Sequence, residues 1–209
     1  MSLLCNLQNI NLAFGQKIIF EDAKFSIEQG DRIGLIGLNG QGKSTLFNIL
    51  SGKVTPDISE PPFIFDKNKD RFDLFYIPQE LAVDEFTDLT VENFYLSFYP
   101  ELYIVHQKLE KVQAELMEDY SNEKLLDIQQ DLMDKFEAGK GWEIENAYLS
   151  YLKTFELDQS QTVPSKMSGG EQRKMALSIG LSSKANFVLW DEPTNHLDAV
   201  SYTHLRAHE

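Results

Sequence analysis

Apolar and polar residues alternate roughly in the N-terminal part of the chain, which predicts two β-strands, over residues 3–14 and 18–28. Residues 29–31 are predicted to form a turn. The β-branched segment 32–36 predicts a third strand, short and buried. A glycine-rich turn then leads into a helix that begins at Ser44, which completes a strand, loop and helix unit.

A second kind of pattern appears further along the chain. Residues 53–71 are rich in Pro, Asp and Lys and predict a loop, which is followed by a strand over residues 72–77. Between residues 101 and 137, apolar residues recur twice at four-three-four spacing, which predicts an antiparallel helical hairpin. Either Ser121 or Asn122 suits the capping position of the second helix.

The C-terminal half adds two helices and one strand. The pattern predicts helices over residues 142–155 and 172–181, and a short apolar strand over residues 187–190. The chain combines predicted strands with predicted helices, including a strand, loop and helix unit, so the predicted fold class is α/β.

Composition and charge exclude several functional classes of protein. The net charge of -14 over 209 residues argues against a broad surface for nucleic acid or anionic lipid. The single cysteine, Cys5, excludes an internal disulfide and fits a reducing compartment. The N-terminus has no signal peptide pattern, and no apolar run approaches the roughly 20 residues that span a membrane. We therefore expect a cytoplasmic protein without a membrane span.

Residues 37–44 fit the P-loop pattern G-x-x-x-x-G-K-[ST]. Glycines let backbone N–H groups approach phosphate oxygens, and the helix that follows presents its positive end to the same anion. Lys43 is expected to reach the β- and γ-phosphates, and Ser44 to coordinate Mg²⁺. The nucleotide-binding residues predicted in this loop are Gly37, Asn39, Gly40, Gln41, Gly42, Lys43, Ser44 and Thr45.

Two carboxylates follow the predicted strand over residues 187–190. Ligands of open α/β sheets bind beyond the carboxyl ends of the strands, so Asp191 and Glu192 stand where a nucleotide site needs acids. Asp191 suits a Mg²⁺ ligand, and Glu192 suits the base that orients the attacking water. An acidic pair after a strand is usually a solvated turn, and it is the P-loop in the same chain that favours the functional interpretation.

Three further segments carry a family resemblance. The segment 167–172, with sequence MSGGEQ, resembles the signature motif of ATP-binding cassette (ABC) proteins, and Gln79 after a strand resembles their Q-loop. The segment 191–198 resembles Walker B running into the D-loop. The order of the motifs is that of the ABC superfamily, and Asn-His before Leu-Asp resembles the ABC-F branch. Met1-Ser2-Leu3 and Gly141-Trp142-Glu143 look closest to Uup-type members.

The resemblance covers residues 1–198 and implies an ABC cassette with a P-loop NTPase core. The core would comprise residues 1–80 and 167–198, with a helical subdomain over 81–166 that contains the hairpin 101–137 as an arm-like insertion. The family further implies that Phe14 stacks on adenine and that Gln79 senses Mg²⁺ and the γ-phosphate. The residues implied to face the ATP of a second cassette are Ser168, Gly169, Gly170 and Glu171.

For the complete protein, the resemblance implies ATP hydrolysis that drives action on the ribosome. The hairpin carries ten acidic residues against four lysines, a net charge of -6, so its expected contact is a basic ribosomal protein rather than RNA. An ordinary solvated helical pair is an equal interpretation of the hairpin. Alternative functions are the ATPase subunit of a membrane transporter, a nucleotide-binding fragment without turnover, and a role in DNA repair.

The last residues depart from the family. Residues 200–209, with sequence VSYTHLRAHE, resemble a translated sequencing adapter, so we expect 199–209 to be a non-native tail. The switch histidine, the linker and the second cassette are then expected to lie outside this sequence. His204 and His208 are accordingly not assigned as the switch histidine.

Overall fold

The computed structural model describes residues 3–38, 40–60, 73–157 and 163–193. The chain divides into two compact units, the first comprising Met1–Ile77 with Ala185–Asp191 and the second comprising Pro78–Lys184 with Glu192–Glu209. The predicted tail 199–209 and the end of the D-loop segment lie outside the described residues.

Antiparallel strands form one part of the first unit. The long strands β1 (Leu3–Phe14) and β2 (Lys17–Glu28) confirm the two predicted strands. The sheet has the order β2-β1-β3, because the short strand β3 (Ile58–Glu60) pairs with the other edge of β1. The prediction of loop over residues 53–71 was therefore wrong at β3. Three residues are too few to show an alternating pattern, and pairing with β1 is what makes them a strand.

The segment 32–36 does not form the predicted buried strand. Residues 31–38 have no regular secondary structure, and the Ile36 side chain is 96% exposed. A strand requires a hydrogen-bonded neighbour. The two described sheets of this unit pair their strands without this segment, so its β-branched composition alone does not bury it.

A helix and a parallel strand pair form the other part of the first unit. Helix α1 (Lys43–Leu50) follows the P-loop, as predicted. Strand β4 (Leu74–Ile77) pairs in parallel with β5 (Phe187–Trp190), with Ile77 opposite Trp190. Leu46 and Leu50 of the helix form an apolar cluster with Leu189 of β5. These contacts attach the helix that follows the P-loop to the strand that precedes Asp191.

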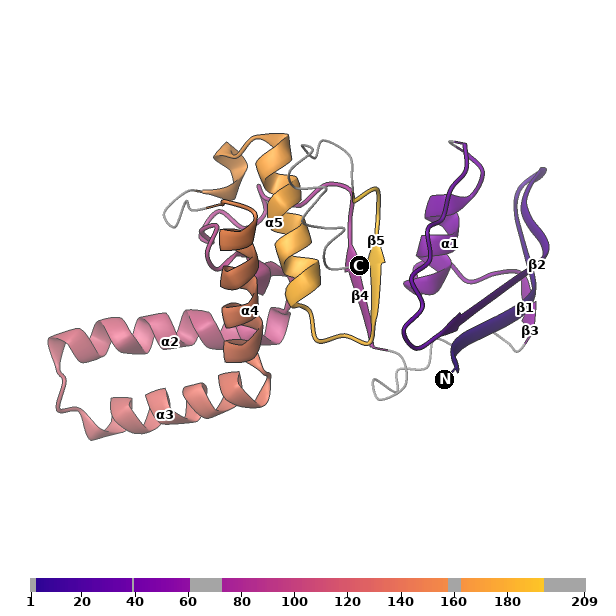
Figure 1. The fold of residues 1–209 in the computed structure, drawn as a ribbon. Coiled ribbons are helices and arrows are strands. Elements are labelled where there is room, and N and C mark those ends of the chain that lie inside the picture. Colours follow the sequence, from indigo (N-terminus) through magenta and orange to yellow (C-terminus); the bar gives the residue numbers. More distant parts are fainter. Residues whose placement is uncertain (1–2, 39, 61–72, 158–162, 194–209) are drawn as a thin grey trace. The chain divides into compact units, whose positions relative to one another are not determined.

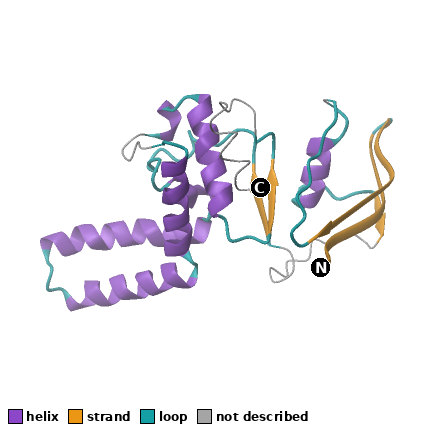
Figure 2. Ribbon diagram, in the orientation of Figure 1, coloured by secondary structure: helices purple, strands orange, loops and turns teal. Residues whose placement is uncertain are grey.

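The second unit is helical (Figures 1 and 2). Its α-helices are α2 (Pro100–Glu118), α3 (Glu123–Ala138), α4 (Gly141–Thr154) and α5 (Gly169–Ser182), with short 3-10 turns η1 (Phe94–Phe98) and η2 (Pro164–Lys166). All four predicted helices are confirmed, although α5 begins three residues earlier than its periodicity indicated. No helix in the part of the chain that the structure describes is long and apolar enough to cross a membrane.

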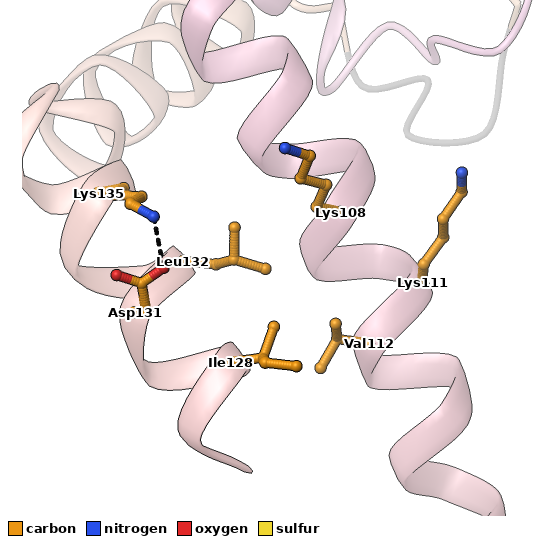
Figure 3. A pocket seen from close by; sticks show the side chains of 7 residues that line it. All are labelled: Lys108, Lys111, Val112, Ile128, Asp131, Leu132 and Lys135. Carbon is orange, nitrogen blue, oxygen red and sulfur yellow. Dashed lines mark hydrogen bonds and ion pairs between the residues drawn. The ribbon is translucent and has the colours of Figure 1, made fainter. Parts of the chain in front are cut away.

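Helices α2 and α3 form the predicted antiparallel hairpin, which projects from the helices α4 and α5 of the same unit (Figure 1). Of the two candidate caps, Asn122 is the one that acts, because its side-chain oxygen accepts a hydrogen bond from the Leu125 N–H at 3.3 Å. A groove of about 360 Å³ lies between the two helices. Its lining consists of apolar and charged side chains: Lys108, Lys111, Val112, Ile128, Asp131, Leu132 and Lys135 (Figure 3).

Aromatic side chains fill the core of the second unit. Tyr95 and Tyr148 are buried side by side, with ring centroids 5.3 Å apart. The Tyr148 hydroxyl donates a hydrogen bond to the Val91 carbonyl at 2.6 Å. At the start of α4, the ring of Phe136 lies so close to Gly141 that a side chain there would collide with it. Helix α4 is thus held by a buried polar contact and by close packing.

Replacing Tyr148 by Phe removes only the buried hydroxyl and leaves the Val91 carbonyl without this donor. We expect the free energy of unfolding to fall by about 1–3 kcal/mol. Urea denaturation followed by circular dichroism measures the change. Tyr120→Phe is the matched control, because Tyr120 is 85% exposed and its hydroxyl faces water. Equal stability of the two variants would show that the buried hydrogen bond contributes nothing.

Candidate functional site

The glycines of the P-loop meet a geometric requirement at the start of α1. Gly42 caps the helix with φ of 92°, a left-handed conformation that favours glycine. A Cβ atom at Gly42 would also lie 2.9 Å from the Ile19 side chain. Gly40 likewise has a φ of 81°. The glycines therefore allow the loop to turn sharply into the helix while it passes close to β2.

Side chains of the P-loop fold back over its own backbone. The Lys43 ammonium donates to the Gly37 carbonyl at 2.7 Å and to the Leu38 carbonyl at 3.1 Å. The Gln41 side-chain oxygen accepts a hydrogen bond from the Leu38 N–H at 2.8 Å. A pocket of about 100 Å³ lies against Gly37, Gln41, Lys43 and Phe20. The Leu38 N–H of the loop therefore donates to a side-chain oxygen, and a phosphate oxygen is an acceptor of the same kind.

The N-terminus of α1 suits an anion. Its cap, Gly42, provides no side-chain acceptor, and the first turn contains no acidic residue. The first N–H groups of a helix have no partner within the helix, and the helix dipole favours negative charge there. Ser44 is the second residue of α1, so its hydroxyl belongs to the same turn as the Lys43 side chain. The residues present therefore fit a phosphate with an accompanying cation.

Asp191 is held at the end of β5 by two contacts from β4. Its backbone N–H donates to the Ile77 carbonyl at 3.0 Å. One of its carboxylate oxygens accepts a hydrogen bond from the Tyr76 hydroxyl at 3.1 Å. Burial and then the negative charge of Asp191 raise the pKa of Tyr76 to about 12, so this phenol remains a donor at neutral pH.

Gln79 and Glu192 meet although 113 residues separate them. The Gln79 amide donates to the Glu192 carboxylate at 2.8 Å. Glu192 also has a φ of 48°, an unusual value for a residue with a side chain. Such a backbone conformation costs free energy and persists only where the surrounding structure imposes it. The predicted Q-loop residue and the predicted base are therefore neighbours in space.

The buried Arg173 of α5 is one of the surroundings that fix this arrangement. Only 6% of the side chain is exposed, and its guanidinium donates to the carbonyls of Pro78 and Glu192. A buried charge is costly unless it is hydrogen-bonded, so this contact is a strong restraint. Arg173 thus ties the helix of the predicted signature to the backbone on either side of the Gln79–Glu192 pair.

The predicted signature residues form the start of α5. The Ser168 hydroxyl accepts a hydrogen bond from the Glu171 N–H, while the Glu171 carboxylate accepts one from the Ser168 N–H at 2.8 Å. This reciprocal pair is a capping box, which satisfies two N–H groups at the helix start. The sequence MSGGEQ therefore has a local structural role in addition to the one that its resemblance implies.

The remaining predicted residues are placed as follows. Phe14 ends β1 with its ring 54% exposed, and Gly15 follows it with a φ of 62°. Asn39 lies outside the described residues. Gln79, Glu192 and the signature belong to the second unit, whereas Phe14, the P-loop and Asp191 belong to the first.

Sequence reasoning missed Tyr76 and Arg173. Tyr76 lies in a short strand that is otherwise apolar. Its position near the end of that strand, three residues before Gln79, is the signal that its hydroxyl could reach the site. Arg173 carries no role in the sequence analysis. The surrounding run of small and apolar residues in α5 is a signal that the helix is covered on all sides, so a charge within it needs partners.

A magnesium site requires few ligands from this chain. Mg²⁺ at nucleotide sites keeps several waters and binds through one or two protein groups together with the phosphates. A hydroxyl from Ser44 and a carboxylate from Asp191 supply suitable hard oxygen donors. Among the described residues there is no group of three or more His, Cys, Asp or Glu that would hold a metal ion alone. The donor set therefore fits a metal bound together with a nucleotide.

The chain is similar to known proteins in sequence and in fold. The family model for ABC transporters matches residues 20–195. The energy-dependent translational throttle protein EttA of Mycobacterium tuberculosis is 28% identical over 207 residues, which cover 97% of this chain and 35% of that protein. The ATP-binding protein Uup of Haemophilus influenzae is 31% identical over 195 residues, which cover 93% of this chain and 29% of that protein.

A solved structure, the ATP-binding subunit of an ABC transporter, superposes with a TM-score of 0.62. It is 21% identical and covers 98% of this chain and 72% of its own, which shows a shared fold. The chain spans about a third of the length of the curated relatives EttA and Uup, both members of the ABC-F branch. With the family match extending over most of its residues, the chain belongs to the ABC family of ATP-binding cassettes and has the P-loop NTPase fold of that family.

Proposed function

We propose that this chain is the N-terminal cassette of an ABC-F protein, which binds Mg-ATP and, when paired with a second cassette, hydrolyses it to drive a step at the ribosome. The observation that carries the proposal is the 2.8 Å contact between Gln79 and Glu192. It brings together the two residues that the family uses to sense the γ-phosphate and to orient water. A site that only bound nucleotide would not need this pair.

Nucleotide binding would rest on the first unit. The N–H groups of the P-loop and of the α1 N-terminus would bind phosphate oxygens. Lys43 would exchange its bonds to the Gly37 and Leu38 carbonyls for the β- and γ-phosphates. Ser44 and Asp191 would hold Mg²⁺, which neutralises phosphate charge when bound. The exposed ring of Phe14 would stack on adenine.

Hydrolysis would rest on groups from two cassettes. Glu192 would accept the proton of the attacking water, and Gln79 would hold Glu192 while it contacts the γ-phosphate side of the site. The start of α5 would serve the opposite site, where Ser168 and the N–H groups of Gly169 and Gly170 face the ATP of the second cassette. Each cassette is thus half of two sites, so turnover belongs to the paired protein.

A ribosomal role in the cytoplasm is supported by the relatives and by the hairpin. EttA is named a translational throttle protein. The hairpin 101–137 has a net charge of -6, and it projects from the helical unit (Figure 1). Such a surface is complementary to a basic protein, and ribosomal proteins are rich in basic residues. The hairpin is therefore the proposed contact with the ribosome, and the remainder of the cassette is the ATP-driven part.

Replacing Lys43 by Ala removes the ammonium that would contact the phosphates. A hydrogen bond to a charged group contributes about 1.5–3 kcal/mol, so the dissociation constant of Mg-ATP should rise roughly ten- to hundredfold. Isothermal titration calorimetry on the 209-residue chain measures it. Lys124→Ala, which removes an exposed lysine of the hairpin, should leave the affinity unchanged. The P-loop assignment fails if both variants bind Mg-ATP equally.

Glu192→Gln separates binding from turnover in the complete two-cassette protein. The variant amide can still accept the hydrogen bond from Gln79, so the local geometry and the affinity for Mg-ATP should persist. Loss of the base should slow hydrolysis by about 10²- to 10⁴-fold, as measured by phosphate release under saturating ATP. Glu80→Gln is the neighbouring control and should hydrolyse at the wild-type rate. Wild-type turnover in the Glu192 variant would remove this residue from the mechanism.

Four exposed acids of the hairpin test its contact with the ribosome: Glu115, Glu118, Asp127 and Glu137. Changing all four to Lys reverses the net charge of the hairpin and should weaken co-sedimentation of the complete protein with ribosomes by about tenfold or more at low salt. Changing the same four to uncharged amides should give an intermediate loss. Undiminished sedimentation with ribosomes, or sedimentation with membranes instead, would contradict the ribosomal role.

A further inference from the structure

Tyr76 belongs to none of the nucleotide-binding motifs, yet it contacts one of them directly. Its hydroxyl donates a hydrogen bond of 3.1 Å to the Asp191 carboxylate, across 115 residues of sequence. Asp191 is the carboxylate that would hold Mg²⁺ beside Ser44. A group that hydrogen-bonds a metal-binding carboxylate controls which way that carboxylate points.

The pairing of the two strands explains why Tyr76 reaches Asp191. In the parallel register Tyr76 lies opposite Leu189, two residues before Asp191. The backbone N–H of Asp191 donates to the Ile77 carbonyl at 3.0 Å. Consecutive residues of β4 therefore restrain Asp191 at its backbone and at its side chain, and rotation of the carboxylate would break the second contact.

The Tyr76 ring is itself fixed from other directions. It packs against the apolar cluster that contains Leu46 and Leu50 of α1. The Lys53 ammonium lies over the ring, 4.6 Å from its centroid. A cation over an aromatic face is attracted by the ring and limits its motion. The hydroxyl thus projects from a ring that is anchored to the helix following the P-loop.

We propose that Tyr76 is a positioning residue for the Mg²⁺ site, because its hydroxyl holds the Asp191 carboxylate that would bind the metal in one orientation. This inference rests on the proposed function, because it requires a nucleotide-bound Mg²⁺. An ionised carboxylate offers two oxygens with about four acceptor positions, and the bond to the phenol engages one of these positions. The same ring packs against the cluster formed by Leu46, Leu50 and Leu189.

Tyr76→Phe tests the inference, because it removes one hydroxyl and keeps the ring. Calorimetry on the 209-residue chain measures ATP affinity over a series of Mg²⁺ concentrations and again with excess EDTA. The variant should need about tenfold more Mg²⁺ for half-maximal enhancement of ATP binding, since lost contacts to metal-binding groups weaken metal affinity about 10- to 100-fold. In EDTA, the affinity of the variant for ATP should equal that of the wild type.

Tyr103→Phe is the matched control. It removes an equivalent bond, from the Tyr103 hydroxyl to the Asp88 carboxylate at 2.6 Å, in the helical unit. It should leave the Mg²⁺ dependence unchanged. A double-mutant cycle with Asp191→Asn adds a second readout: if Tyr76 acts through Asp191, the phenol should have no further effect on Mg²⁺ dependence once the carboxylate is gone.

Two results would overturn the inference while leaving the proposed function intact. One is an unaltered Mg²⁺ dependence in Tyr76→Phe. The other is an equal loss of ATP affinity with and without Mg²⁺, which would indicate a structural role only. If the wild-type chain binds ATP neither with Mg²⁺ nor in excess EDTA, the proposed function itself is refuted, and the inference is refuted with it.

Discussion

The parallel pairing of β4 with β5 is the constraint on which the candidate site depends. The two strands come from distant parts of the sequence and end together, with Ile77 opposite Trp190. The segments that follow therefore start from one edge of the pair, which is where α/β proteins collect their functional groups. A slip of one residue in the register would turn the side chains of a strand to its opposite face and separate Tyr76 from Asp191.

Several weaker contacts depend on this pairing and reinforce it. The apolar cluster of Leu46, Leu50 and Leu189 attaches α1 to β5, so the helix that follows the P-loop has a fixed relation to the strand that precedes Asp191. The Arg173 guanidinium holds the backbone next to Gln79 and at Glu192. Apolar packing attaches α1 to β5, and hydrogen bonds hold the segments that carry Gln79 and Glu192. The two kinds of contact suit their tasks, because apolar packing tolerates small shifts whereas hydrogen bonds fix the direction of a polar group.

Two helix starts in the chain illustrate how local chemistry serves different purposes. Helix α1 starts at Gly42 without a side-chain acceptor, so its first N–H groups stay available to an anion. Helix α5 starts with the Ser168 and Glu171 capping box, which satisfies two of its N–H groups. Both starts are glycine-containing motifs, yet only the start of α5 has a side-chain cap. The proposed pairing with a second cassette gives the start of α5 its ligand.

The sequence by itself determined the elements whose causes are local. The glycines before Lys43, a cap at Ser121 or Asn122 and the four-three-four spacing of the hairpin each act within a few residues, so the P-loop helix and the hairpin were predicted from them. The short motifs of the chain also predicted its family. The roles assigned to the site residues follow from the same motifs and stay predictions.

Only the tertiary structure decided contacts between residues far apart in the sequence. It left the segment 31–38 exposed although its composition is that of a strand, because pairing partners are chosen in space. It brought Gln79 to Glu192 and Tyr76 to Asp191, and it buried Arg173 among carbonyl groups. Hydrogen bonds of this kind act over about 3 Å and leave no periodic trace in the sequence, so the chain had to fold before they could be identified.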